Sequence, residues 1–344
     1  EWFGYRYGMR AGGNVDHDPH GEFTGRNILY RAHSVEETAA RFGATQAEVA
    51  AALNRIEREL MAARGKRVRP HLDDKILAGW NGLMISALAL GGAVLKEPRY
   101  AGAARRAADF VLARMYDGAS GVLRRRYRDG EAAIAGFLDD YAMFAQALLD
   151  LYEAQFDPRH LELALALTEK MRDLFEDREA GGFYSSAADE ASVILRVKED
   201  YDGAEPSGNS VAVSNLLRLS AITGRADLRE SAERTLRAFG SRLSHVAAAI
   251  PRMLSACEWI EAGAREIVIA GEDAGALVEA LYARFVPHRI VLRTDGASRD
   301  RVAALAPWTA SMQPADGRAA AYVCRDYTCQ LPVSEPARLD ELIQ

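Results

Sequence analysis

The sequence has few cysteines, no excess of positive charge and no long apolar run, and each shortage excludes a class of protein. Three cysteines in 344 residues cannot build a disulfide framework, so a reducing, cytoplasmic environment is the simpler expectation. The formal net charge of −6 gives no electrostatic footprint for nucleic acid. The longest apolar run, 83–95, is too short to cross a bilayer, and no signal peptide is visible. We therefore expect neither nucleic acid nor a membrane as a partner.

The composition is that of a globular protein with a substantial core. Apolar residues make up 49% of the chain and charged residues 27%. Cys324 and Cys329 have a C-x4-C spacing without a second pair, which does not predict a zinc site. The chain opens on Glu1 within EWFGYRYGMRAGGNV, which is typical of the middle of a protein. We expect a fragment that needs no cofactor or metal.

A unit of roughly 60 to 70 residues recurs three times between Asp73 and Arg242. Each unit begins with polar residues, continues as a long apolar helix, turns, and ends as a helix with one charged face. The expected helix pairs are 72–95 with 101–115, 137–155 with 161–175, and 205–223 with 229–243. Because the first helices are apolar nearly all round, we expect them to form an inner layer covered by the second helices.

Short β-prone segments join the units at 121–134 and at 181–186 followed by 191–199, and both predict hairpins. Two helical layers with hairpins at one face indicate a mainly α protein, an (α/α)6-toroid of the six-hairpin glycosidase type, here incomplete. An open stack of helical hairpins has the same local pattern and stays an alternative. Upstream, 34–64 predicts two helices, with Ser34 and Glu37 as a capping box.

The periodicity changes after Arg265, where a strand, a helix, a second strand and a third strand at 320–324 predict a small α/β region. We therefore divide the chain into an N-terminal segment, 1–64, the toroid hairpins, 65–262, and a C-terminal α/β region, 263–344.

Acids, amides and aromatics crowd the starts of the three inner helices. We name LDDKILAGWN, 72–81, the first rim, GFLDDYA, 136–142, the second rim, and DYDGAEPSGNS, 200–210, the third rim. In a toroid these starts converge on one mouth. Carboxylates and amides bind sugar hydroxyls, and aromatic rings stack on sugar rings. The rims therefore predict a sugar-like ligand.

Each rim residue also has a structural role open to it. Asp73 and Asp74 are adjacent, as are Asp139 and Asp140, and adjacent residues point about 100° apart on a helix. One acid of each pair can therefore cap the helix while the other faces the mouth. Lys75 can form a structural ion pair, Trp80 and Asn81 can be core residues, Ser207 can be a cap, and Tyr184 can be hairpin packing.

Two carboxyl groups at a set separation would support glycosidase chemistry. Asp140 or Asp74 with Glu205 or Asp202 could supply them. A sugar epimerase would favour histidines that titrate near neutrality. Only His71 lies near a rim, so a two-histidine mechanism has weak support.

The rims and their surroundings resemble the YyaL-like family of spermatogenesis-associated protein 20. The matching segments are KRVRPHLDDKILAGWNGLMISALA, RDGEAAIAGFLDDYAMFAQALLDLYEA, GGFYSS and VKEDYDGAEPSGNSVAVSNLLRL, and the resemblance covers essentially the whole chain. It implies a thioredoxin-like domain followed by an (α/α)6 barrel akin to N-acylglucosamine 2-epimerases. The thioredoxin-like segment and the first barrel hairpins are absent from this chain. The resemblance implies a fold rather than a reaction.

Two hypotheses follow, and whether the protein is an enzyme stays open between them. In the first, the barrel mouth binds or modifies a sugar-like molecule. Asp140 and Glu205 are its acid/base candidates. The residues expected to bind the hydroxyl groups of the ligand are Asp74, Lys75, Asn81, Asp202 and Asn209, and those expected to stack on its ring are Trp80, Tyr141 and Tyr184. In the second, the barrel is a non-catalytic scaffold for a thioredoxin-like redox domain. Apolar faces left by missing hairpins could also mediate oligomerisation.

Overall fold

The computed structural model describes residues 1–189 and 193–344 and divides into two compact units, 1–73 and 74–344. The first unit contains helices α1 (Trp2–Arg6), α2 (Val35–Phe42) and α3 (Gln46–Gly65). The predicted capping box is present, because the Ser34 hydroxyl accepts from the Glu37 N–H and the Glu37 carboxylate accepts from the Ser34 N–H. A small cluster of Ala39, Val49 and Leu53 forms its core.

Three helical hairpins build most of the second unit, as the repeat predicts. They are α4 (Ala78–Val94) with α5 (Pro98–Arg114), α6 (Leu138–Gln155) with α7 (Pro158–Phe175), and α8 (Gly208–Thr223) with α9 (Ala226–Ala238). The central inner helix, α6, contacts both α4 and α8. A Cβ on Gly82 would lie 2.6 Å from the Met143 carbonyl oxygen, so a glycine permits the close approach of α4 and α6. The mainly helical, two-layered toroid class is confirmed.

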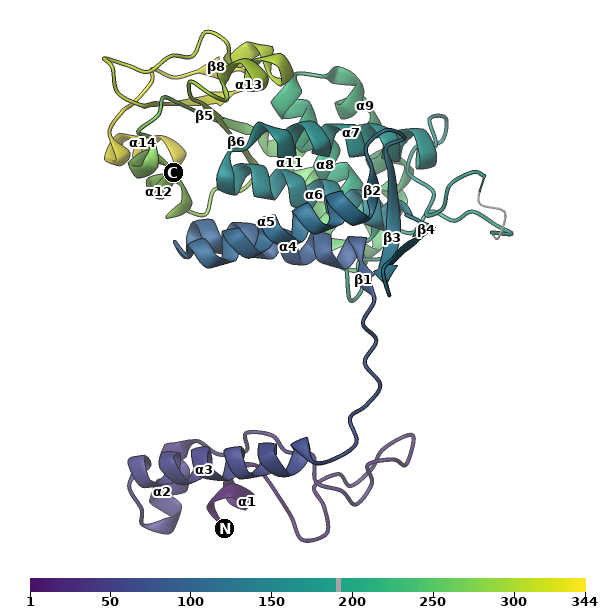
Figure 1. The fold of residues 1–344 in the computed structure, drawn as a ribbon, viewed down its shortest axis with the longest axis vertical. Helices are drawn as coiled ribbons and strands as arrows, with labels where there is room; N and C mark the ends of the chain where they lie inside the picture. The colour runs from purple at the N-terminus through teal and green to yellow at the C-terminus, as the bar shows by residue number, and fades with distance from the viewer. Residues whose placement is uncertain (190–192) are drawn as a thin grey trace. The chain divides into compact units, whose positions relative to one another are not determined.

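The first joining segment forms the predicted hairpin. Strand β3 (Val122–Arg128) pairs antiparallel with β4 (Glu131–Ala135), and also with the short strands β1 (Ile76–Leu77) and β2 (Tyr116–Asp117). Figure 1 places this sheet at the end of the helical layer where α4 begins. These strands therefore lie beside the rims.

The second joining segment is not a hairpin in the part of the chain that the structure describes, so that prediction is wrong there. One isolated bridge joins Glu176 to Phe183, and the Ser185 N–H donates to the Val197 carbonyl at 2.8 Å. Side chains hold the segment instead. Arg196 donates to the Ser186 carbonyl, and Lys198 donates to the Gly181 carbonyl and to Asp177. Positions 191 and 192 of the predicted second strand lie outside the described residues.

The predicted outer helix 229–243 is shorter than expected. It ends at Ala238 and is followed by α10 (Gly240–Val246), a 3-10 turn η1 (Ala247–Ala249), and α11 (Pro251–Ala262), which packs on α8. None of the helices in the described ranges has the length and apolarity that crossing a bilayer requires.

The first inner helix keeps part of its apolar surface exposed. Trp80, Met84, Leu90 and Val94, all on α4, are between 48% and 62% accessible. Their spacing places them on one side of the helix. The suggested oligomerisation through such a face stays a prediction.

The C-terminal region is a small α/β region, as predicted, and its sheet has a fourth strand beyond the three that were predicted. Its elements are β5 (Arg265–Ala270), α12 (Gly275–Tyr282), β6 (Arg289–Thr294), α13 (Arg299–Leu305), η2 (Pro307–Thr309), β7 (Ala320–Arg325), β8 (Thr328–Cys329) and α14 (Pro336–Ile343). The strand order is β6-β5-β7-β8, with β5 and β6 parallel and the other neighbours antiparallel. Helices α12 and α14 contact each other.

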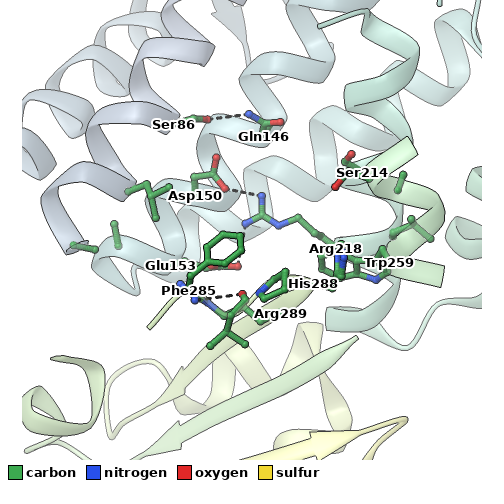
Figure 2. A pocket seen from close by; sticks show the side chains of 18 of the residues that line it. Ser86, Gln146, Asp150, Glu153, Ser214, Arg218, Trp259, Phe285, His288 and Arg289 are labelled. Carbon is green, nitrogen blue, oxygen red and sulfur yellow. Dashed lines mark hydrogen bonds and ion pairs between the residues drawn. The ribbon is translucent and has the colours of Figure 1, made fainter. Parts of the chain in front are cut away.

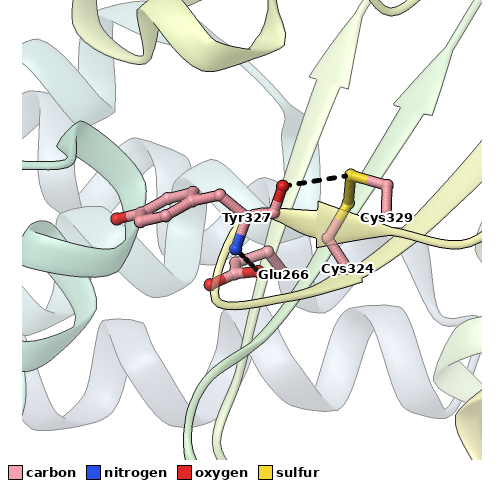
Figure 3. Close-up of a disulfide and its surroundings, with 4 residues drawn as sticks. All are labelled: Glu266, Cys324, Tyr327 and Cys329. Carbon is pink, nitrogen blue, oxygen red and sulfur yellow. Dashed lines mark hydrogen bonds between the residues drawn. A yellow bond between two sulfur atoms is a disulfide. The ribbon is translucent and has the colours of Figure 1, made fainter.

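The turn between β7 and β8 carries a disulfide bond that the sequence analysis did not anticipate. Asp326 and Tyr327 adopt left-handed conformations, with φ of 49° and 60°, which form a tight two-residue turn. The turn places Cys324 opposite Cys329, and the two sulfur atoms are bonded (Figure 3). The Tyr327 N–H donates to the Glu266 carboxylate at 3.2 Å and anchors the turn to β5.

Candidate functional site

The second rim holds its most buried acid, Asp140, in a network within the protein. Asp140 is 1% exposed. Its carboxylate accepts hydrogen bonds from the N–H groups of Phe137 and Gly79, at 3.0 and 3.1 Å, and from Arg125, at 2.8 Å. Burial raises the pKa of Asp140 to about 6, and Asp139 adds to the rise, while Arg125 and the two N–H groups oppose it. Asp140 therefore caps α6 and ties it to α4 and β3.

The third rim uses two of its predicted ligands as connectors. Asn209 is fully buried, and its amide bonds to the N–H and carbonyl of Phe183 and to the Glu199 carbonyl. Asp202 accepts from the N–H groups of Ser207 and Arg252, both at 2.8 Å, so it joins the start of α8 to the start of α11. The Ser207 hydroxyl caps α8, as one interpretation of the sequence had it.

The first rim starts its helix later than predicted. Helix α4 begins at Ala78 and has no side-chain cap, so neither Asp73 nor Asp74 caps it. A short strand occupies 76–77 because it pairs with β3. Asp74 forms an ion pair of 2.8 Å with Arg128, Lys75 is exposed at the start of this strand, and Asn81 donates to the Leu77 carbonyl.

Of the predicted site residues, the structure brings Trp80 and Glu205 together. The Trp80 indole donates to the Glu205 carboxylate at 2.6 Å. This bond joins the first rim to the third across 125 residues. Trp80 is 62% exposed and is therefore not a core residue.

The two predicted tyrosines have internal partners. Tyr141 is buried, and its hydroxyl accepts from the Leu123 N–H at 2.8 Å. The Tyr184 hydroxyl donates to Asp177 at 3.1 Å. The Arg196 guanidinium lies 4.0 Å from the centroid of the Tyr184 ring, so a cation already occupies a face of that ring.

A cavity of about 550 Å³ lies between the second and third rims, and we name it the rim pocket. Its polar lining residues are Arg125, Asp139, Ser185, Ser186, Glu199, Tyr201, Glu205 and Ser207. Asp139 faces this cavity, whereas the adjacent Asp140 does not. Arg125 reaches both acids, at 3.3 Å from Asp139 and 2.8 Å from Asp140. The first rim does not line this pocket, but its Trp80 bonds to Glu205, which does.

A second cavity, of about 490 Å³, lies where the three inner helices face α11 and the segment before β6, and we name it the inner pocket. Arg218 on α8 donates to Asp150 and Glu153 on α6, at 2.6 and 3.0 Å. Figure 2 shows Arg218 pointing toward Asp150, with Trp259, Phe285 and His288 around the same cavity. Burial raises the pKa of Glu153, against the opposing effect of Arg218.

The chain is similar along nearly its whole length to part of a longer protein. It is 38% identical to human Spermatogenesis-associated protein 20 and 36% identical to the mouse protein, each over 352 aligned positions that cover 98% of this chain and 45% of the relative. The chain is homologous to about half of spermatogenesis-associated protein 20. This confirms the expected resemblance, and no protein-family model matches the chain.

Solved structures of related shape include sugar-processing enzymes. Cellobiose 2-epimerase from Spirochaeta thermophila matches with 18% identity and a TM-score of 0.40, over 49% of this chain and 44% of the enzyme. A GH76 α-mannanase from Bacteroides thetaiotaomicron matches with 14% identity and a TM-score of 0.45, over 70% of this chain and 72% of the enzyme.

The polar starts of the inner helices predicted the rims, whereas the inner pocket was not predicted. Gln146, Asp150 and Glu153 are spaced four and three residues apart, on one face of a helix that is otherwise apolar. Ser214 and Arg218 repeat this spacing on the next inner helix. Polar residues that recur on one face of two apolar helices were the available signal.

Proposed function

We propose that the chain binds a sugar-like ligand in the rim pocket, with Glu205 and Asp139 as the carboxyl groups available for acid–base chemistry. The observation that carries this proposal is the position of Glu205. It lines the same cavity as Asp139 and Arg125, and it accepts a hydrogen bond from Trp80. Two carboxyl groups in one cavity meet the first requirement of glycosidase-like chemistry.

The rim pocket has the size and lining that a sugar requires. Its volume of about 550 Å³ lies within the range of small-molecule sites. Tyr201 and Phe137 offer aromatic surface, while Ser185 and Glu199 offer hydrogen-bonding groups. Asp140, the acid first predicted to be catalytic, then supports the pocket by positioning Arg125 beside Asp139.

Titration calorimetry with neutral mono- and disaccharides tests the proposal. We expect Glu205→Gln and Asp139→Asn to weaken binding at least tenfold, because each removes an anionic acceptor for ligand hydroxyls. Glu131→Gln is the matched control, since the Glu131 side chain is 70% exposed on β4 and does not line the pocket. A wild-type chain that binds no sugar, or two pocket variants that bind as well as the control, would overturn the proposal.

The alternative, a scaffold for a thioredoxin-like redox domain, stays a prediction. The redox domain of that hypothesis is expected outside this chain, and residues 1–344 contain no Cys-x-x-Cys motif. Cys324 and Cys329 are bonded to each other, on β7 and the edge strand β8.

A further inference from the structure

We propose that the inner pocket binds a small hydroxylated carboxylate, such as a sugar acid, through the guanidinium of Arg252. This site is separate from the rim pocket and goes beyond the function proposed for it. The two pockets use different faces and different ends of the inner helices, and their lining sets share no residue.

The charges that line the inner pocket leave a positive surplus. Arg218, Arg252 and Arg289 face two carboxylates, Asp150 and Glu153. Arg218 is bound to both carboxylates. Across residues 1–189 and 193–344, neither Arg252 nor Arg289 has a carboxylate within the 4.0 Å of an ion pair. One unit of positive charge is therefore left for a ligand.

Arg252 carries most of this surplus. It lies in the first turn of α11, and its guanidinium donates to the Gln146 side-chain carbonyl at 2.9 Å. Burial lowers the pKa of Arg252 and Arg218 acts in the same direction, while the carboxylates of Asp150 and Asp202 oppose this shift. A half-buried guanidinium that has no carboxylate in ion-pair contact gains free energy when a ligand anion binds to it. Arg289 has a different neighbour, since its guanidinium lies 4.9 Å from the Tyr282 ring centroid.

The surroundings of Arg252 favour a carboxylate over a phosphate. A planar guanidinium matches a carboxylate through two parallel hydrogen bonds. A phosphate carries up to two negative charges near neutral pH, and in this cavity it would also meet Asp150 and Glu153. These two acids are suited instead to accept hydrogen bonds from hydroxyl groups.

The remaining lining completes a site for a hydroxylated ring. Ser86 and Ser214 offer hydroxyls from α4 and α8, and Trp259 and Phe285 offer apolar faces. Phe285 is 93% exposed, so a ligand could cover it. A cavity of about 490 Å³ accommodates a molecule of monosaccharide size.

The backbone of Arg252 is fixed independently of any ligand. Its N–H donates to Asp202, which also receives the Ser207 N–H. Helix α11 is thereby held to the loop that starts α8. The guanidinium is thus presented from a fixed position, which reduces the entropic cost of binding.

Calorimetric titration of the whole chain with D-glucuronate, D-glucose and glucose 6-phosphate tests the proposal. We expect glucuronate to bind at least tenfold more tightly than either of the other two. Arg252→Gln should remove this preference by weakening the binding of glucuronate at least tenfold. Arg252→Lys should retain part of the preference, because it keeps the positive charge but not the planar guanidinium that forms two parallel hydrogen bonds. Arg237→Gln is the control, since the Arg237 side chain is 67% exposed on α9 and does not line the pocket.

Three results would overturn the proposal. They are no binding of glucuronate to the wild type, tighter binding of glucose 6-phosphate, and equal glucuronate affinity in Arg252→Gln and Arg237→Gln. If Arg252→Gln does not fold, the wild-type protein still tests the proposal, because a lack of preference for glucuronate over glucose would contradict it. The same preference should appear as a larger rise in the melting temperature of the wild type with glucuronate than with glucose. Because D-glucose is also an expected ligand of the rim pocket, the titrations are repeated in Glu205→Gln, which leaves the lining of the inner pocket unchanged. The two proposals then fail separately.

Discussion

The two ends of the inner helices use polar side chains in opposite ways. At the rims, Asp140 and Asn209 bond mainly to backbone groups. In the inner pocket, Arg218 bonds to the side chains of Asp150 and Glu153. Since a helix leaves its first N–H groups without internal partners, polar residues at its start are needed for capping. Within a helix the backbone groups already have hydrogen-bond partners, so a polar cluster there has to be explained by interactions among its side chains or with a ligand.

This contrast separates residues that build the fold from residues that are available to a ligand. Asp139 and Asp140 are adjacent in sequence, but only Asp139 lines the rim pocket. The density of polar residues in a motif therefore does not identify the ligand-binding members. Substituting residues of the two classes one at a time tests the distinction between fold-building and ligand-binding residues.

The largest effect is expected from Asp140→Ala. The substitution leaves Arg125 and the N–H groups of Phe137 and Gly79 without their shared acceptor. Breaking a buried charged network by removing one partner costs about 3–5 kcal/mol. Urea denaturation followed by circular dichroism would measure the loss in the free energy of unfolding.

Asp139→Ala is the matched control for this prediction. The Asp139 side chain is 33% exposed and forms one ion pair, of 3.3 Å, with Arg125. Such a pair contributes about 1 kcal/mol or less. Equal destabilisation by the two substitutions would contradict the division of roles between these neighbours.

A smaller effect is expected from pH, and it has a definite sign. The pKa of Asp140 is about 6 in the folded protein, raised by burial from an ordinary value of 3.8. Between these values the folded chain binds more protons than the unfolded chain, so the contribution of Asp140 to the free energy of unfolding falls as the pH rises from about 4 to about 6. The difference between wild type and Asp140→Asn should therefore shrink over this range by up to about 3 kcal/mol. A difference that is constant from pH 4 to pH 7 would show that Asp140 titrates normally.

Most of the fold could be predicted from the sequence because it follows local rules. Apolar periodicity located the three hairpins, and prolines fitted the first positions of α5 and α7. The segment 181–199 was predicted wrongly because the interactions of Arg196 and Lys198, not strand pairing, hold its described part. The disulfide was missed because it depends on two non-glycine residues at positive φ, which sequence patterns rarely indicate.

The site was less predictable, because it depends on which residues from distant parts of the sequence lie close together in space. The bond between Trp80 and Glu205 spans 125 residues and has no signature in either rim alone. The inner pocket combines α6 and α8 with residues after α12, such as Phe285 and His288. Charge and periodicity could mark the faces of the two helices, but they could not indicate which later segment would cover them.

The smallest effect is expected from Trp80→Phe, which tests whether the first rim acts on the rim pocket. The substitution removes the hydrogen bond to Glu205 and keeps an aromatic ring on an exposed surface. The free energy of unfolding should change by about 1 kcal/mol or less, while the affinity for neutral sugars should fall about fivefold as Glu205 loses its orientation. Trp308→Phe is the control, since it removes a similar bond, to the Ile222 carbonyl at 2.7 Å, away from both pockets. If sugar affinity falls equally in both variants, the rims and the rest of the helical layer do not differ in the way proposed.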